Sequence, residues 1–146
     1  MNQNNWLKLN LQHFAETTTY DFKKVSVIVD GSIITGFMDG ESIAVEKNED
    51  DVTAHVGAAG DVTFSDTNDN TATITLTLKQ TSSSLPVLDA LRKSKALFAT
   101  QIVDSNNNTF RAGGSDCRIV KAPARTWGNE VTGVEVQIYV ADYQEA

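Results

Sequence analysis

Apolar and polar residues alternate along several stretches of this chain, as in strands that have one face on a core and the other on water. The clearest stretch is TATITLTLKQ at residues 71–80, where no charge occurs before Lys79. One side of such a strand carries Ala72, Ile74, Leu76 and Leu78, and the other carries Thr71, Thr73, Thr75 and Thr77. The pattern predicts an amphipathic strand with a row of four hydroxyl groups on its polar face.

Other strands are predicted on both sides of this one. Residues 25–29 (VSVIV) and 33–37 flank Asp30-Gly31, a favoured two-residue hairpin turn. Alternation returns at 41–46 and in the last strand, where one side carries Val134, Val136, Ile138 and Val140. We therefore expect about seven or eight strands in antiparallel order.

One helix is predicted at about residues 84–95. Ser84 is placed to cap it, and Pro86 is tolerated in a first turn because its missing N–H costs little there. Leu85, Leu88 and Leu91 fall on one face, so this short helix should pack on the sheet. Its C-terminal end carries Arg92, Lys93 and Lys95.

Two segments depart from the strand pattern. Residues 1–19 are polar and are expected to form an N-terminal arm, ahead of a single domain at 20–146. Residues 47–61, KNEDDVTAHVGAAGD, are predicted to form a long loop because acidic residues open the segment and glycines close it. A loop of this length in a compact domain is usually functional or disordered.

The predicted fold class is therefore mainly β. We expect a β-sandwich or half-barrel of two packed antiparallel sheets, flanked by the helix at about 84–95 and by the loop at about 47–61. A chain of 146 residues with 40% hydrophobic and 21% charged residues fits one soluble folded domain. The N-terminus does not read as a secretory signal, and no stretch has the length of a membrane span.

The net charge of −7 is unevenly distributed. Residues 1–78 carry −8, residues 79–125 carry +5 and the remainder carries −4. This split is typical either of a dipolar surface that meets copies of itself head to tail or of a patchwork of solvated faces. It does not include the basic, aromatic-studded stripe of a sequence-specific nucleic-acid binder.

The sequence contains only weak matches to catalytic and ligand-binding motifs. Asp66, Asn68 and Asn70 resemble the start of a calcium loop, but Thr71 replaces the glycine of the sharp turn and Thr77 the bidentate glutamate. His13 and His55 are far apart, and the single Cys117 permits no internal disulfide. There is no G-x-S-x-G elbow and no phosphate loop. We expect no catalytic residues, metal or cofactor, and no small-molecule substrate.

Residues 25–91 resemble the tail tube proteins of contractile-tailed bacteriophages. The stretches that carry the resemblance are VDG at 29–31, ITGF at 34–37, HVGAAG at 55–60 and TITLTLKQTSS at 73–83. It continues more weakly through the C-terminal strands. Separately, LKLNLQHFAE at 7–16 is similar to an N-terminal stretch on structural proteins of phages of Gram-positive hosts.

The resemblance implies a virion structural protein, made in the host bacterial cytoplasm and located in the phage tail. Six subunits would form a ring whose inner strands join into one barrel, and stacked rings would form a tube for genome delivery. The implied partners are further copies of the chain, the tail sheath, the baseplate and the tail terminator. DNA would pass through the lumen without specific binding.

Three sets of residues follow as candidates for this assembly. The lumen-facing candidates are Thr71, Thr73, Thr75, Thr77 and Glu46, because hydroxyls and carboxylates do not attract phosphate. The resemblance assigns contact with the adjacent ring to the long loop, with candidates Glu49, Asp50, Asp51, His55, Gly57 and Gly60. The charge split favours a complementary basic surface at Arg92, Lys93, Lys95 and Arg111.

Other interpretations stay open at the level of sequence. The threonine row also fits an ordinary solvent-exposed sheet, where β-branched residues are common. The tubes of phage-tail-like bacteriocins and type VI secretion systems are similar, and a head or baseplate protein would share the phage origin. A carbohydrate-binding β-sandwich is a different class, for which only Trp6 and Trp127 offer indole rings.

Overall fold

The computed structural model describes residues 17–146, so Trp6, His13 and most of the predicted N-terminal arm lie outside the described residues. A short 3-10 turn, η1 (Phe22–Lys24), leads into the first strand. The remaining elements, in chain order, are β1 (Val25–Val29), β2 (Ser32–Ile33), β3 (Ile43–Lys47), β4 (Val52–Val56), β5 (Val62–Asp66), β6 (Ala72–Lys79), α2 (Ser84–Ser94), β7 (Phe98–Asp104), β8 (Phe110–Ile119), β9 (Gly133–Val140) and β10 (Gln144–Glu145).

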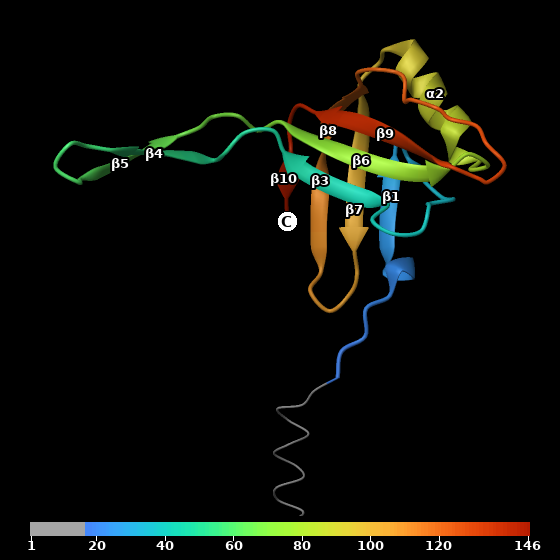
Figure 1. Ribbon diagram of the computed structural model, residues 1–146, viewed down its shortest axis with the longest axis horizontal. Helices are drawn as coiled ribbons and strands as arrows, with labels where there is room; N and C mark the ends of the chain where they lie inside the picture. Colours follow the sequence, from blue (N-terminus) through green and yellow to red (C-terminus); the bar gives the residue numbers. More distant parts are fainter. Residues whose placement is uncertain (1–16) are drawn as a thin grey trace, which may run out of the picture.

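Eight strands form one antiparallel sheet in the order β2-β1-β7-β8-β9-β6-β3, with β10 added beside β8. Figure 1 shows β3, β6 and β9 crossing β1, β7 and β8, so the sheet curls into two layers. The long strand β8 joins the layers, because it pairs with β7 along most of its length and with β9 at Cys117–Ile119. The mainly-β prediction is confirmed, and the two packed layers are halves of one continuous sheet.

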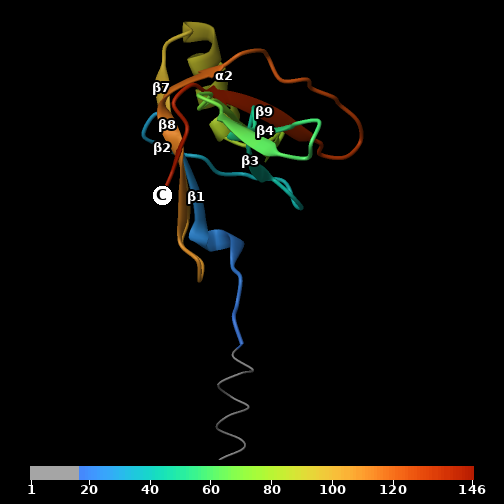
Figure 2. The ribbon, with the colours of Figure 1, turned by 90° about the vertical axis from the view of Figure 1, so that its left-hand side faces the viewer.

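The core lies between the layers and is built by strict alternation. Along β6 every second residue is buried, from Ala72 to Leu78. The neighbouring strand β9, which pairs with β6 in the same layer, alternates in the same way and buries Val134, Val136, Ile138 and Val140. Val27 and Val29 of β1 close the core from the other layer with no exposed surface. Figure 2 shows the two layers side by side, with α2 above them.

The helix lies where the leucine spacing predicts, but its N-terminus differs from the prediction. Leu85 and Leu88 are buried, and Leu91 packs against the core. Ser83, not Ser84, holds the N-cap position, and its side chain makes no capping bond. The Ser84 Oγ instead accepts the N–H of Thr35 at 3.0 Å, while Ser82 Oγ donates to the Thr35 carbonyl at 2.6 Å. These serines join the helix to the β2–β3 connection instead of capping it.

The loop predicted at 47–61 is largely a two-stranded hairpin, which corrects the sequence-based expectation. β4 and β5 pair antiparallel from Val52 opposite Asp66 to Val56 opposite Val62. The Gly57–Gly60 stretch is the turn, closed by the Gly57 N–H donating to the Asp61 carbonyl at 2.7 Å. Figure 1 shows this hairpin arm projecting away from the body of the molecule. The prediction gave weight to the glycines and acids and overlooked the alternation in VTAHV and VTFSD.

Candidate assembly site

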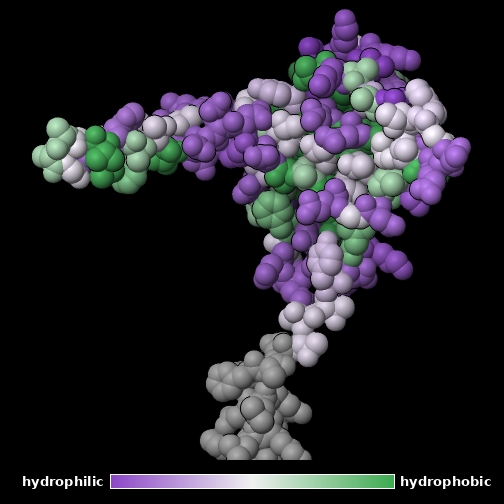
Figure 3. Space-filling view, in the orientation of Figure 1, coloured by the Kyte–Doolittle hydropathy of each residue, from purple (hydrophilic) through white to green (hydrophobic). Residues whose placement is uncertain are grey.

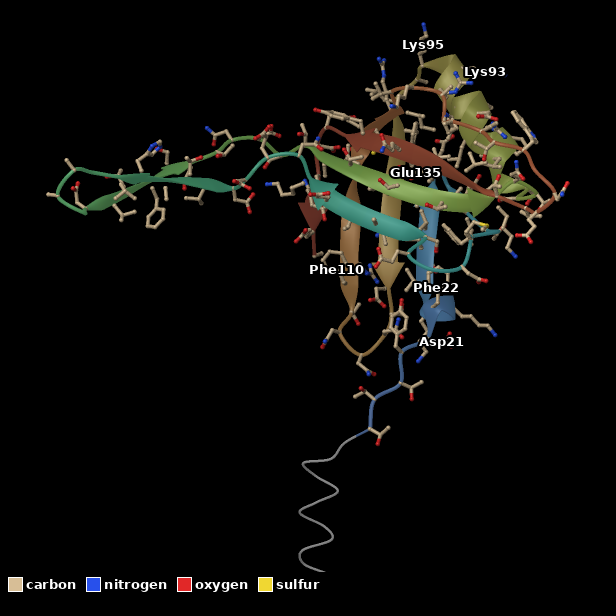
Figure 4. The ribbon with its side chains drawn as sticks, in the orientation of Figure 1. Asp21, Phe22, Lys93, Lys95, Phe110 and Glu135 are labelled. Carbon is tan, nitrogen blue, oxygen red and sulfur yellow. The ribbon has the colours of Figure 1, made fainter. Side chains whose placement is uncertain are left out.

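The predicted threonine row lies on the outer face of the layer formed by β3, β6 and β9. Thr71, Thr73, Thr75 and Thr77 are all partly exposed, and Thr71 stands directly before β6. The register sets Thr73 between Glu46 and Tyr139, Thr75 between Ala44 and Gln137, and Thr77 beside Glu135. The residues directly opposite the threonines on β3 and β9 therefore include two carboxylates. Lys47, at the end of β3, lines the same hollow as Thr73 and Thr75 and forms an ion pair with Asp51. Glu135, which the sequence reasoning missed, is labelled in Figure 4.

A chain of side-chain hydrogen bonds orders one end of the row. The Asn48 amide donates to Thr71 Oγ1 at 3.0 Å and accepts from Thr73 Oγ1 at 2.8 Å. Thr71 Oγ1 in turn donates to the Asp69 carboxylate at 2.6 Å. This hydroxyl bond, together with the Thr71 N–H, holds the pKa of Asp69 below its ordinary value. The hydroxyls at this end are thus fixed by the root of the hairpin.

Both edges of the threonine-bearing layer offer backbone groups for further pairing. Within residues 17–146, β3 pairs with β6 alone. β9 pairs with β8 only at residues 138–140, so the edge of Gly133–Gln137 away from β6 has no strand beside it. Unpaired edges are templates for strand addition from another chain. Neither edge of the threonine-bearing layer is therefore fully paired with a further strand in the described residues, and residues 121–126 of the β8–β9 connection line a hollow beside the β9 edge.

The hairpin arm has one apolar and one polar face. Residues directly opposite in an antiparallel pair point to the same side. Ala54 opposite Phe64 and Val56 opposite Val62 therefore share a face with Val52, while His55 opposite Thr63 lies on the other. Val56 is 72% exposed and Phe64 is 68% exposed. Figure 3 shows hydrophobic residues along the outer part of this arm.

The residues predicted to contact the adjacent ring do not form one cluster. Glu49, Asp50 and Asp51 lie at the root of the hairpin before β4, and Asp51 forms an ion pair with Lys47. Gly57 and Gly60 lie at the tip, and His55 is exposed on the polar face. The apolar face between root and tip is the feature that the sequence reasoning missed. Its signal was the alternation of valine, alanine and phenylalanine with polar residues.

The predicted basic surface is only partly brought together. Arg92 and Lys95 line a groove with Arg118 and Lys121, neither of which was predicted. The Nε of Arg92 is buried there without a hydrogen-bond partner in the described part of the chain. Lys93 lies near the same end of α2, whereas Arg111 follows Phe110 at the far end of β8 (Figure 4). Arg111 is therefore not part of this basic groove.

No arrangement for metal chemistry is found in residues 17–146, where no group of three metal-ligating side chains occurs. Burial raises the pKa of the Cys117 thiol, so this cysteine is kept in its unreactive thiol form.

None of the helices in the described residues is long and apolar enough to cross a membrane. The features that stand out are the strand edges without a paired neighbour and the exposed apolar face of the hairpin arm.

Solved structures with a similar fold include chains of an extracellular contractile injection system and of the anti-feeding prophage. The sheath/tube terminator of an extracellular contractile injection system (PVC) matches with a TM-score of 0.61 at 10% identity, covering 90% of this chain and 99% of that one. The tube-terminating cap of the anti-feeding prophage matches with a TM-score of 0.57 at 8% identity, over 89% and 92% of the two chains. A chain of the PVC sheath-tube complex matches with a TM-score of 0.57 at 10% identity, over 92% and 96%.

The chain thus shares its fold with tube-terminating subunits and with a chain of a sheath-tube complex. The family model described as Bacteriophage PhiTE tail tube protein matches residues 17–136, and the chain belongs to this family. The protein is therefore a structural subunit of a phage tail tube. A sequence search of curated proteins finds no significant match.

Proposed function

We propose that this tail tube subunit closes into rings of six copies, and that the rings stack into a channel through which the phage genome is delivered. The observation that carries the proposal is a single layer, β3-β6-β9, with two incompletely paired edges and a polar face around the threonine row. Pairing one copy's open edge with the next copy's removes the exposed edges, as barrel closure does. The count of six follows the family resemblance.

In this proposal the threonine row and Glu46 face the lumen. Glu135 and Gln137 of β9 lie on the same face and extend it. Lysine and arginine would bind DNA phosphates by counterion release, whereas hydroxyls give little attraction and carboxylates repel them. DNA then passes without specific binding, and the subunit acts as a structural element without a catalytic role.

The hairpin arm is proposed to connect successive rings. A two-stranded hairpin exposed on both faces is marginal in water, so its apolar face is best stabilised by packing on a neighbour. Contact between the acidic root at Glu49–Asp51 and the Arg92, Lys93 and Lys95 end of α2 would add electrostatic complementarity. Arg111 lies apart from that end and is left out of this contact.

The proposed partners are further copies of the chain, a contractile sheath, a tail terminator and a baseplate. Support comes from fold relatives described as parts of a sheath-tube complex and of a sheath/tube terminator. The proposed place of action is the virion tail, after synthesis in the host bacterial cytoplasm. The same relatives favour one second candidate function, the tube of an injection device that carries no genome. Electron microscopy of purified particles distinguishes the two functions, because only phage tails are attached to DNA-filled heads.

Negative-stain microscopy over a concentration series tests the proposal. The unaltered protein should form rings or tubes. A variant in which an Asn-Gly turn replaces residues 49–70 should stay folded and form no structure larger than a single ring. It should fold because the Asn48 N–H already donates to the Thr71 carbonyl at 3.1 Å, so the new ends are adjacent. The matched control, Thr53→Ser with His55→Gln on the polar face, should still form tubes. Long tubes from the hairpin-less variant would rule out the hairpin as the stacking element.

A further inference from the structure

The segment between β8 and β9, residues 120–132, presents large apolar side chains to water. Trp127 is 80% exposed and Val131 is 52% exposed. An exposed tryptophan leaves a large apolar surface in contact with water, which is unfavourable in the single subunit. Tryptophan is also enriched at the centres of protein–protein interfaces. We call residues 120–132, which include Trp127 and Val131, the Trp127 loop. Its first residues, as far as Lys121, line the basic groove, whereas Trp127 and Val131 belong to none of the surfaces assigned above.

The Trp127 loop is fastened to the body at several points. Gln80 uses both ends of its amide: its Nε2 donates to the Thr126 carbonyl, and its Oε1 accepts the Thr132 N–H at 3.1 Å. The Thr132 hydroxyl also donates to the Thr126 carbonyl at 2.9 Å. On the other side, Arg125 donates to Asp89 of α2 at 2.8 Å. The chain on both sides of Trp127 and Val131 is therefore anchored before any partner arrives, which lowers the entropy cost of binding.

The Trp127 loop and the hairpin arm lie at opposite ends of the same strands. The hairpin leaves the body between β3 and β6 at the end where Ala72 pairs with Val140. The Trp127 loop enters β9 at Gly133, which pairs with Lys79 at the other end of β6. Figure 1 shows the hairpin on the left and this loop on the right of the layer. At ~3.3 Å per residue, the eight residues of β6 separate these ends by roughly 25 Å.

Rings that stack head to tail need two different, complementary surfaces at the two ends of each subunit. We propose that the Trp127 loop of one copy is the receptor for the apolar face of the hairpin arm of a copy in the adjacent ring. The indole of Trp127 and the side chain of Val131 would pack on Val56, Val62 and Phe64 of that hairpin. This inference rests on the proposed function, because it names the docking partner of the hairpin. Its chemistry is apolar and aromatic contact, supplemented by the charges at the hairpin root.

The intrinsic fluorescence of Trp127 tests the inference without any substitution in the proposed docking surface. The chain has two tryptophans, so Trp6→Phe leaves Trp127 as the single reporter. Across the concentration series that produces tubes, its emission should shift to shorter wavelength and its quenching by iodide should fall. The variant lacking residues 49–70 should show neither change. Tubes in which Trp127 stays as accessible as in the monomer would overturn the inference and leave the proposed function standing.

Disulfide trapping identifies the partner directly. Phe64→Cys chains mixed with Trp127→Cys chains should give crosslinked dimers on oxidation, and a Phe64→Cys/Val131→Cys chain should give a ladder. Val87→Cys on α2 replaces Trp127→Cys in the matched control and should give no dimer; the buried Cys117 stays as it is. Tubes without crosslinks, or a Trp127 that becomes protected only when sheath protein is added, would contradict the inference. Failure of the parent protein to form rings or tubes would instead overturn the proposed function, and the inference with it.

Discussion

Gly113 lies so close to Thr100 that a β-carbon on this glycine would stand 2.0 Å from the Thr100 carbonyl oxygen. Its φ of +151° is also one that side-chain-bearing residues rarely adopt. The contact coincides with a register shift between β7 and β8 at Phe98 and Thr100. Beyond it, Cys117–Ile119 of β8 pair with β9. A bulge bends a strand, so this close approach marks where the sheet turns from one layer into the other.

Gly113→Ala is therefore expected to destabilise the subunit by more than about 2 kcal/mol, because the strained backbone and the clash with a main-chain atom cannot both be relieved. Urea unfolding of the monomer measures the change. Gly128→Ala is the matched control, since nothing lies within 4 Å of the new methyl group. Equal stability of the two variants would show that the β7–β8 bulge tolerates a side chain.

Asp142 ties the C-terminal segment to β8 and should make stability depend on pH. Its carboxylate accepts the Ser115 hydroxyl at 2.6 Å and the Asp116 N–H at 2.9 Å, and these bonds hold its pKa below the ordinary value. A lowered folded-state pKa gives stability that is present above the unfolded pKa near 3.8 and is lost as pH falls through the folded value.

Asp142→Asn should thus lower the free energy of unfolding by about 1 kcal/mol at pH 7, a modest change because the carboxylate is partly solvated. The difference between the variant and the unaltered protein should shrink as the pH falls below 4. Urea unfolding at pH 7 and at pH 3 gives both numbers. Asp50→Asn, at an exposed carboxylate of the hairpin root, should change little at either pH. A cost for Asp142→Asn that stays the same at low pH would show that the ionised form has no special role.

Leu88 is the main anchor of α2, with 1% of its surface exposed, whereas its neighbour Val87 is 38% exposed. Leu88→Ala should cost about 2–5 kcal/mol through lost burial and the cavity left behind. Val87→Ala on the solvent side should stay within about 0.5 kcal/mol. Thermal or urea unfolding separates the two, and similar costs would mean that the helix does not depend on this leucine for docking.

The lumen assignment is tested by adding charge to the threonine face. Thr73→Lys with Thr75→Lys should leave tubes intact and slow or block genome ejection, because ammonium groups on a channel wall bind passing phosphates. Single-particle ejection assays and plaque counts measure the effect. Asn107→Lys with Thr109→Lys, in the β7–β8 turn, makes the same change of charge away from this face and should eject normally. Normal ejection by the threonine variant would contradict the lumen assignment and favour the interpretation of this face as an ordinary solvent-exposed sheet.

Strands β1, β3, β6 and β9 and the helix could be predicted because their signals are local, whereas the strand predicted at 33–37 is only the short β2 (Ser32–Ile33). In β6 and β9 a core on one side and water on the other impose a period of two on the residues themselves. The hairpin arm was predicted as a loop because its apolar residues are exposed in the single subunit, and its glycine turn resembles irregular chain. Ser84 was predicted as a cap because local sequence does not reveal that Thr35 would supply its hydrogen-bond partner.

The sequence by itself determined the mainly-β class, the buried and exposed faces of β6 and β9 and the leucine face of α2, because burial selects residue type one position at a time. Only the tertiary structure decided that one sheet forms both layers, that its threonine-bearing layer has two incompletely paired edges, and that the basic groove includes Arg118 and Lys121 but not Arg111. Only the fold placed the hairpin and Trp127 at opposite ends of one strand pair. These relationships join residues far apart in the chain, and pairing register, not local composition, brings them together.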